Sequence, residues 1–151
     1  MGSNINDKIV DSDNVSTTPY LCRDTGGIQQ PLGFRKGLSI ASLNVNSLQL
    51  HFDEIQCLAN ELGIHVLALN ETKLNPRVPK NLISIEGYQV ERKDRTSIGG
   101  GVAIYIRNSI KYHPRNDLPV NDLELICIEI EPPKSPPYII VAWCRPPPVI
   151  L

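Results

Sequence analysis

The sequence lacks the features that would assign it to a membrane, to the secretory route or to a class with a basic nucleic-acid-binding surface. It contains no run of about 18 apolar residues, the length that a membrane-spanning helix requires. Its N-terminus has neither the basic segment nor the apolar stretch of a signal peptide. The formal net charge is −1, so no overall positive field attracts a polyanion. We therefore expect an intracellular protein whose contacts with any polyanion depend on local groups.

Cysteine is also scarce, and the four cysteines lie far apart, at positions 22, 57, 127 and 144. No pair has the spacing of a zinc-ligand motif, and no histidine forms a cluster with them. The sequence therefore predicts no structural zinc site. With 41% hydrophobic and 21% charged residues, the composition is that of an ordinary globular domain with a core.

Residues 1–36 differ in composition from the remainder of the chain. They are rich in Asn, Asp, Ser, Thr, Gly and Gln and show no helical or strand periodicity, so we predict a disordered tail. From residue 37 to residue 151 apolar side chains recur at regular intervals. We predict that this second part holds one partial domain.

The start of this domain predicts a parallel strand–helix–strand unit. Residues 38–43 and 65–69 are short apolar runs, as in buried strands, and apolar residues between them recur every three or four positions, as on one face of a helix. Ser47 is a candidate N-cap and Gly63 a candidate C-terminal cap of this helix. Strands joined through a helix are typical of parallel neighbours in a sheet.

A series of further strands follows, predicted over residues 88–91, 102–107, 123–130 and 138–143. The prolines between the last two favour a hairpin-like connection. Three glycines at 99–101 lack the spacing of a phosphate-binding loop and precede a strand, so a tight turn with positive φ is the better interpretation. One helix-linked pair followed by several strands predicts a mixed sheet of the α/β or α+β class.

Asn44 and Glu71 are the first candidates for a functional site, because each follows a predicted buried strand. The ends of parallel neighbouring strands lie about 5 Å apart, and ligands favour this edge of a sheet. A carboxylate is a hard oxygen ligand suited to Mg²⁺, and an amide can orient a phosphate without adding charge. The alternative is structural, since polar residues commonly end strands where loops begin. Arg95 belongs to a basic loop cluster at 92–95, which either is simply solvated or contacts phosphate.

Five segments, in order, resemble the conserved blocks of non-LTR retrotransposon (LINE-type) endonucleases of the endonuclease/exonuclease/phosphatase family. They are Ser-Leu-Asn-Val-Asn-Ser-Leu at 42–48, Leu-Ala-Leu-Asn-Glu-Thr-Lys-Leu at 67–74, Gly-Tyr at 87–88 with Arg-Lys-Asp-Arg at 92–95, Gly-Gly-Gly-Val-Ala-Ile-Tyr-Ile-Arg at 99–107, and Cys-Arg-Pro-Pro at 144–147. The similarity extends from about residue 37 to residue 147 and represents the N-terminal portion of that domain.

The resemblance implies a fold of two β-sheets packed face to face with helices outside. It also implies Mg²⁺-dependent phosphodiester hydrolysis in DNA, which a eukaryotic chain would perform in the nucleus. Glu71 would be the metal ligand and, with Asn44, a catalytic residue, Asn44 positioning the scissile phosphate. Asn46, which would sit near the metal, Arg95 and Arg145 would bind substrate. The divalent ion would stabilise charge on the phosphoryl oxygens.

Two departures from the family pattern bear on activity. Cys144 stands where the family usually has a tyrosine hydroxyl, and a thiol is a weaker donor. The later motifs, Gly-Asp-Phe-Asn and Ser-Asp-His, are missing, since no Asp follows Asp122 and no His follows His113. We therefore expect a truncated domain that is inactive alone. A partner chain that supplies the missing motifs, or a non-catalytic nucleic-acid- or protein-binding module that reuses the fold, are the alternatives.

Overall fold

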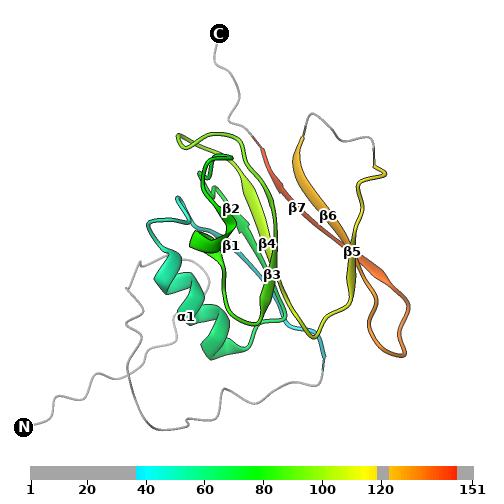
Figure 1. The fold of residues 1–151 in the computed structure, drawn as a ribbon. Coiled ribbons are helices and arrows are strands. Elements are labelled where there is room, and N and C mark those ends of the chain that lie inside the picture. The colour runs from blue at the N-terminus through cyan, green and yellow to red at the C-terminus, as the bar shows by residue number, and fades with distance from the viewer. Residues whose placement is uncertain (1–36, 119–122, 146–151) are drawn as a thin grey trace, which may run out of the picture.

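Two β-sheets and one α-helix form the part of the chain that the computed structural model describes, residues 37–118 and 123–145 (Figure 1). The elements are β1 (Ile40–Asn44), α1 (Phe52–Leu62), β2 (Val66–Asn70), the short 3₁₀ helix η1 (Lys80–Ile83), β3 (Tyr88–Lys93), β4 (Val102–Arg107), β5 (Tyr112–Pro114), β6 (Glu124–Ile130) and β7 (Tyr138–Cys144). One sheet has the order β1-β2-β4-β3 and the other the order β5-β6-β7. The expected mixed α/β class with two sheets is confirmed. The predicted tail, 1–36, lies outside the described residues.

The predicted strand–helix–strand unit is present at the start of this fold. β1 and β2 pair in parallel, with Ser42 opposite Ala68, and α1 connects them. Gly63 ends the helix in the left-handed conformation at φ 57°, as its missing Cβ permits. The expectation that Ser47 caps the helix is wrong, because α1 begins later and its N-cap is His51. The Ser47 N–H instead donates to the Glu71 carbonyl at 2.9 Å.

β2 and β4 are buried on both faces because they form the middle of a three-layer arrangement, with α1 on one side of the first sheet and the second sheet on the other (Figure 1). Alternate side chains, such as Leu67 and Tyr105, pack in the cluster that contains Ile55 and Ala59 of α1. The intervening side chains pack against the second sheet, in a cluster of Val66, Ala68, Ile104, Ile106, Ile128, Ile130 and Ala142. Burial on both faces explains why the two strands are almost uninterrupted apolar runs.

β6 and β7 form the predicted antiparallel hairpin, with Cys127 opposite Val141. β5 was not predicted from sequence, since it has three residues and includes Pro114, a poor match to any strand pattern.

The free edge of β7 has no strand partner within the described segments. Of the outward side chains of β7, Trp143 is 61% exposed. No helix in the described part of the chain is long and apolar enough to cross a membrane.

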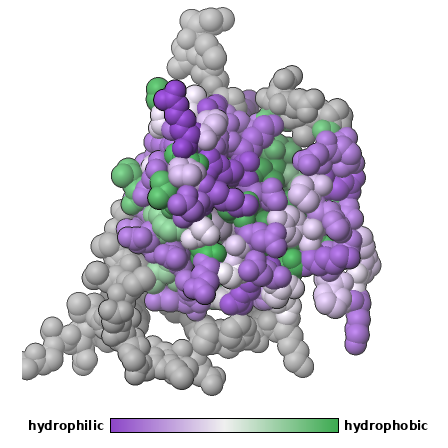
Figure 2. Space-filling model, viewed as in Figure 1, coloured by the Kyte–Doolittle hydropathy of each residue, from purple (hydrophilic) through white to green (hydrophobic). Residues whose placement is uncertain are grey.

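The face of the molecule seen in Figure 2 is mostly hydrophilic, with hydrophobic side chains visible in the space between the two sheets. Figure 1, drawn from the same direction, shows β3 of the first sheet and β5 of the second sheet on either side of this space. The apolar material is thus concentrated where the layers meet.

Candidate functional site

Three loops converge at the edge of the first sheet where β1 and β2 end and β4 begins. The N–H of Ser47, after β1, donates to the carbonyl of Glu71, after β2, at 2.9 Å. The N–H of Lys73 donates to the carbonyl of Gly100 at 2.9 Å. These backbone bonds join the loop after β1, the loop after β2 and the glycine turn, which we define as residues 99–101. The edge is therefore a bonded unit and not three independent loops.

The predicted proximity of Asn44 and Glu71 at one end of the sheet agrees with the strand register. Asn44 pairs with Asn70, the residue that precedes Glu71. The Asn44 amide oxygen accepts the Asn46 N–H at 3.2 Å, which shapes the loop after β1. The catalytic role of either residue stays a prediction.

Backbone strain is concentrated at this edge. Five described non-glycine residues have positive φ, and four of them lie here: Asn46 at 43°, Ser47 at 94°, Glu71 at 56° and Lys73 at 51°. Each such conformation costs of order 1–3 kcal/mol and persists only where surrounding bonds determine it. The cross-loop hydrogen bonds supply that constraint. Strain of this kind is typical of sites where side chains must be aimed for function.

The Glu71 carboxylate has a separate partner on each oxygen. Its Oε2 accepts the Gly100 N–H at 2.9 Å, and its Oε1 accepts the Cys144 thiol at 3.0 Å. The bond from Cys144, then the bond from Gly100, lower the pKa of Glu71, and the positive charges of Arg95 and Lys73 add to this against a smaller opposing effect of burial. Glu71 is therefore ionised at neutral pH and oriented, as a cation ligand must be.

Cys144, the donor to this carboxylate, lies at the end of β7, an edge strand of the second sheet. Burial, followed by the bond to Glu71 and its negative charge, raises the pKa of the Cys144 thiol to about 11. The thiol therefore remains protonated at neutral pH and donates its hydrogen to Glu71. The position at which the family resemblance leads us to expect a tyrosine hydroxyl thus makes direct contact with the predicted metal ligand.

Glu124, at the start of β6, is a second carboxylate at the site that sequence analysis missed. Its Oε1 forms an ion pair with Arg95 Nε at 2.9 Å, and its Oε2 accepts the Gly101 N–H at 2.9 Å. A signal was present in the sequence, because Glu124 is in phase with Ile126 and Ile128, two strand positions that face the first sheet. A charged residue in phase with core-facing positions requires a buried partner.

The residues predicted to bind substrate are arranged around this cluster in different ways. Arg95 is engaged by Glu124 and also donates from Nε to the Gly99 carbonyl at 3.1 Å. The Asn46 amide oxygen accepts the Lys73 ammonium at 2.5 Å. Arg145 directly follows Cys144 and is exposed. Their proposed contacts with substrate stay predictions.

The side chains of all three histidines have partners outside this cluster: His51 contacts Glu54 at 3.2 Å, His65 contacts Ser39 at 2.7 Å and His113 contacts Glu131 at 2.8 Å. The described part of the site therefore contains carboxylates, amides and basic groups but no imidazole.

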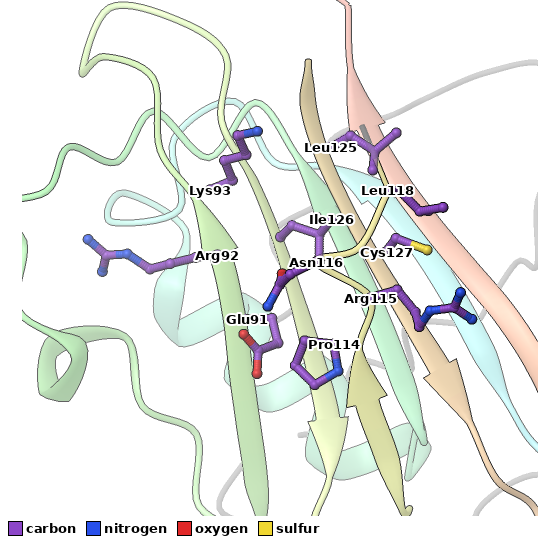
Figure 3. Close-up of a pocket in the computed structure, with 10 residues that line it drawn as sticks. All are labelled: Glu91, Arg92, Lys93, Pro114, Arg115, Asn116, Leu118, Leu125, Ile126 and Cys127. Atoms are coloured by element: carbon purple, nitrogen blue, oxygen red, sulfur yellow. The ribbon is translucent and has the colours of Figure 1, made fainter. Parts of the chain in front are cut away.

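A cavity of about 300 Å³ opens between β3 and the β5–β6 side of the second sheet (Figure 3). Glu91 and Asn116 lie on its two sides, whereas the Arg92 and Arg115 side chains point away from it (Figure 3). Glu91 accepts the Tyr112 hydroxyl at 2.7 Å. None of the predicted site residues lines this cavity, so it is separate from the Glu71 cluster.

The donor set suits a cation that keeps most of its water. No three His, Cys, Asp or Glu side chains within the described ranges form a ready-made metal cage. Mg²⁺ needs no such cage, because it is commonly held by one or two carboxylates and several waters. The ionised, oriented Glu71 carboxylate provides one such ligand. The residues present therefore fit a hydrated magnesium-like ion better than zinc, which takes four nitrogen or sulfur ligands in structural sites.

A family model described as the Endonuclease/Exonuclease/phosphatase family matches residues 41–150. The chain belongs to this family. Nucleases of the family generally use divalent metal ions, in agreement with the donor set at Glu71. The matched range includes the strained edge, the glycine turn and Cys144.

Among solved structures, the crystal structure of AP endonuclease LMAP from Leishmania major is similar to this chain, with a TM-score of 0.52 and 16% sequence identity. The similar region covers 70% of this chain and 38% of the AP endonuclease chain. The chain thus spans well under half the length of that protein, and the likeness concerns the fold. A search of curated proteins found no match.

Proposed function

We propose that this chain provides the metal-ligand portion of a Mg²⁺-dependent DNA endonuclease of the non-LTR retrotransposon type. The observation that supports it most directly is the Glu71 carboxylate, ionised and held from two sides at the strained end of β2. Family membership makes phosphodiester hydrolysis the chemistry that such a ligand would serve. The five sequence blocks are the basis for the retrotransposon subtype and for a DNA substrate.

Each residue of the edge has a role in this proposal. Glu71 would hold Mg²⁺, which when bound supplies positive charge to phosphoryl oxygens. Asn44, on the neighbouring strand, would orient the scissile phosphate through its amide. Asn46 and Lys73, bonded to one another, would contact phosphate oxygens beside the ligand. A DNA substrate also implies that the protein acts where chromosomal DNA lies, the nucleus in a eukaryote.

We further propose that the 151 residues do not cleave DNA by themselves. Activation of water requires a positioned proton acceptor, which contributes on the order of 10²–10⁴-fold in rate. Glu71 would be occupied by metal, and Glu124 is paired with Arg95. All three histidines contact other groups. The described residues of this edge thus offer a metal ligand, whereas Glu124 and the three histidines are engaged by other groups.

A non-catalytic binding module is the second candidate, and the Cys144 contact favours it. The thiol bonds the Glu71 oxygen at 3.0 Å, and thiols are poor donors to phosphate. A fold retained only for binding nucleic acid or protein would tolerate a cysteine in place of the tyrosine that the family usually has at position 144. The two candidates differ in whether Glu71 binds a divalent ion.

The first test measures divalent-ion binding by the chain itself. Mn²⁺ is a paramagnetic substitute for Mg²⁺, and its titration should broaden amide NMR signals in the edge loops before others. Glu71→Gln should abolish this local broadening, while Glu54→Gln, an exposed glutamate of α1, should leave it unchanged. Equal broadening in wild type and Glu71→Gln would refute Glu71 as the metal ligand and favour the binding module.

The second test measures nicking of supercoiled plasmid in Mg²⁺. The chain alone should be inactive, whereas a fusion with the C-terminal portion of a related enzyme should nick. Cys144→Tyr in the fusion should increase the rate. Nicking by the unfused chain that is lost in Glu71→Gln would show that the chain is a working enzyme and that the proposed inactivity is wrong.

A further inference from the structure

The glycine turn presents two successive N–H groups to two different carboxylates. Gly100 donates to Glu71 Oε2 and Gly101 donates to Glu124 Oε2, each at 2.9 Å. The two glutamates come from different sheets, Glu71 from the loop after β2 and Glu124 from β6. The turn is therefore a backbone bridge between the predicted metal ligand and a second acid.

Arg95 completes the attachment of this turn. Its Nε forms the 2.9 Å ion pair with Glu124 and donates to the Gly99 carbonyl at 3.1 Å. The Glu124 side chain is only 12% exposed, so water screens the pair less than it would at the surface. The pair thus holds the turn at both ends, through the Gly99 carbonyl and the Gly101 N–H.

The turn also has no room to move toward its neighbours. A Cβ on Gly100 would lie 2.5 Å from Arg95 Nε and 2.6 Å from Glu124 Oε2. On the other side, a Cβ on Gly101 would lie 2.5 Å from Thr72 Oγ1. The two glycines have φ of 77° and 85°, conformations that other residues rarely adopt. The turn is consequently enclosed between the Arg95–Glu124 pair and the buried Thr72.

We infer that Glu124, together with Arg95, is a positioning residue for the divalent-metal site at Glu71, which it orders through the glycine turn without contacting the metal. This inference rests on the proposed function. Glu71 itself is attached to the turn by the Gly100 N–H, so any loosening of the turn releases one oxygen of the ligand. Outer partners that orient metal-ligating carboxylates typically change metal affinity by about 10- to 100-fold when removed.

The pair also assigns Arg95 a role other than direct contact with substrate. Its Nε is directed at Glu124 and the Gly99 carbonyl, and its charge is balanced by the glutamate. Loss of Glu124 would remove the ion pair of Arg95 and leave the Gly101 N–H without its acceptor. Substitutions of the two residues should therefore have the same direction of effect and should not be additive.

The experiment uses the full chain and two readouts, Mn²⁺ titration and amide hydrogen exchange. Glu124→Ala should weaken Mn²⁺ binding near Glu71 by about 10- to 100-fold and speed exchange at Gly100 and Gly101. Glu124→Gln, which keeps one acceptor oxygen, should give an intermediate effect. Arg95→Gln removes the other partner of the same ion pair. If Glu124→Ala does not fold, Arg95→Gln is the substitute variant, with both readouts expected to change in the same direction.

Glu129→Ala is the matched control, because Glu129 lies on the same strand and also pairs with an arginine, Arg115, at 2.5 Å. It should change neither readout. Faster exchange throughout the edge loops in Glu124→Ala, and not at the glycine turn alone, would indicate general destabilisation and overturn the positioning role.

The two proposals fail in distinguishable ways. Unchanged Mn²⁺ affinity in Glu124→Ala, with loss of binding in Glu71→Gln, would overturn the positioning role and leave the metal ligand standing. Absence of local Mn²⁺ binding in wild type would refute the proposed function and, with it, the metal-positioning role of Glu124. The exchange rates at Gly100 and Gly101 would still establish whether the pair orders the turn.

Discussion

Replacement of Gly101 by alanine separates two physical costs that the structure assigns to the glycine turn. Gly101 has φ of 85°, and a Cβ there would lie 2.5 Å from Thr72 Oγ1. Gly87 provides the matched control, with φ of 83° and nothing within 4 Å of its would-be Cβ. Gly87→Ala therefore measures the backbone cost alone, whereas Gly101→Ala measures the backbone cost and the clash together.

The left-handed conformation costs alanine about 1–2 kcal/mol, which is the expected loss in free energy of unfolding for Gly87→Ala. Overpacking in a closed environment adds about 1–3 kcal/mol, so Gly101→Ala should cost about 2–5 kcal/mol. Thr72 is fully buried and forms part of the same enclosed edge, so its side chain has little space into which to retreat. Urea denaturation followed by circular dichroism measures both values.

A double-mutant cycle tests the origin of the difference. Thr72→Ala removes the atom that clashes, so Gly101→Ala in that background should cost no more than Gly87→Ala. Thr72→Val keeps a branch at the same position, so the penalty should remain. Among the described residues, no group forms a hydrogen bond with Thr72 Oγ1, so Thr72→Val should remove no bond to them. Equal costs for Gly101→Ala and Gly87→Ala in the wild-type background would refute the reasoning.

Two further predictions concern the contact between Glu71 and Cys144. The pKa of Glu71 is lower in the folded protein than its ordinary value of 4.5. Ionised Glu71 therefore stabilises the folded state at pH values above the pKa of the unfolded chain. This stabilisation is lost as the pH falls through the lower pKa of the folded state. Glu71→Gln should reduce the acid dependence of the free energy of unfolding below about pH 5, and an unchanged pH profile would contradict the shift. The pKa of Cys144, about 11, is raised by burial and then by Glu71, so Glu71→Gln should speed alkylation of Cys144 by iodoacetamide at pH 8. The rate at Cys127, whose pKa is raised chiefly by burial, should not change, and equal acceleration at both thiols would indicate loosening of the fold instead.

Sequence alone was sufficient for the elements whose side chains repeat with a clear period. The strand–helix–strand unit and the strands β6 and β7 were predicted because burial on one or both faces imposes regular apolar spacing, and the prolines between β6 and β7 indicated the hairpin. Gly63 was predicted because a helix that ends in the left-handed conformation selects glycine. The edge that holds Asn44 and Glu71 followed from strand order, since parallel strands end at the same edge. The Ser47 cap was wrong because α1 begins only at Phe52, after the N-cap His51.

Only the tertiary structure decided how the site is assembled. Glu124 and Cys144 lie opposite one another on β6 and β7, and the packing of the two sheets brings them to Glu71, in the loop after β2. The positive φ at Glu71 has no residue-type signal, because glutamate, unlike glycine or asparagine, rarely adopts it, and it depends on hydrogen bonds between loops. Local periodicity depends on neighbours in sequence and can be read from them. The partner of a carboxylate across two sheets depends on the relative placement of those sheets, which no local pattern specifies.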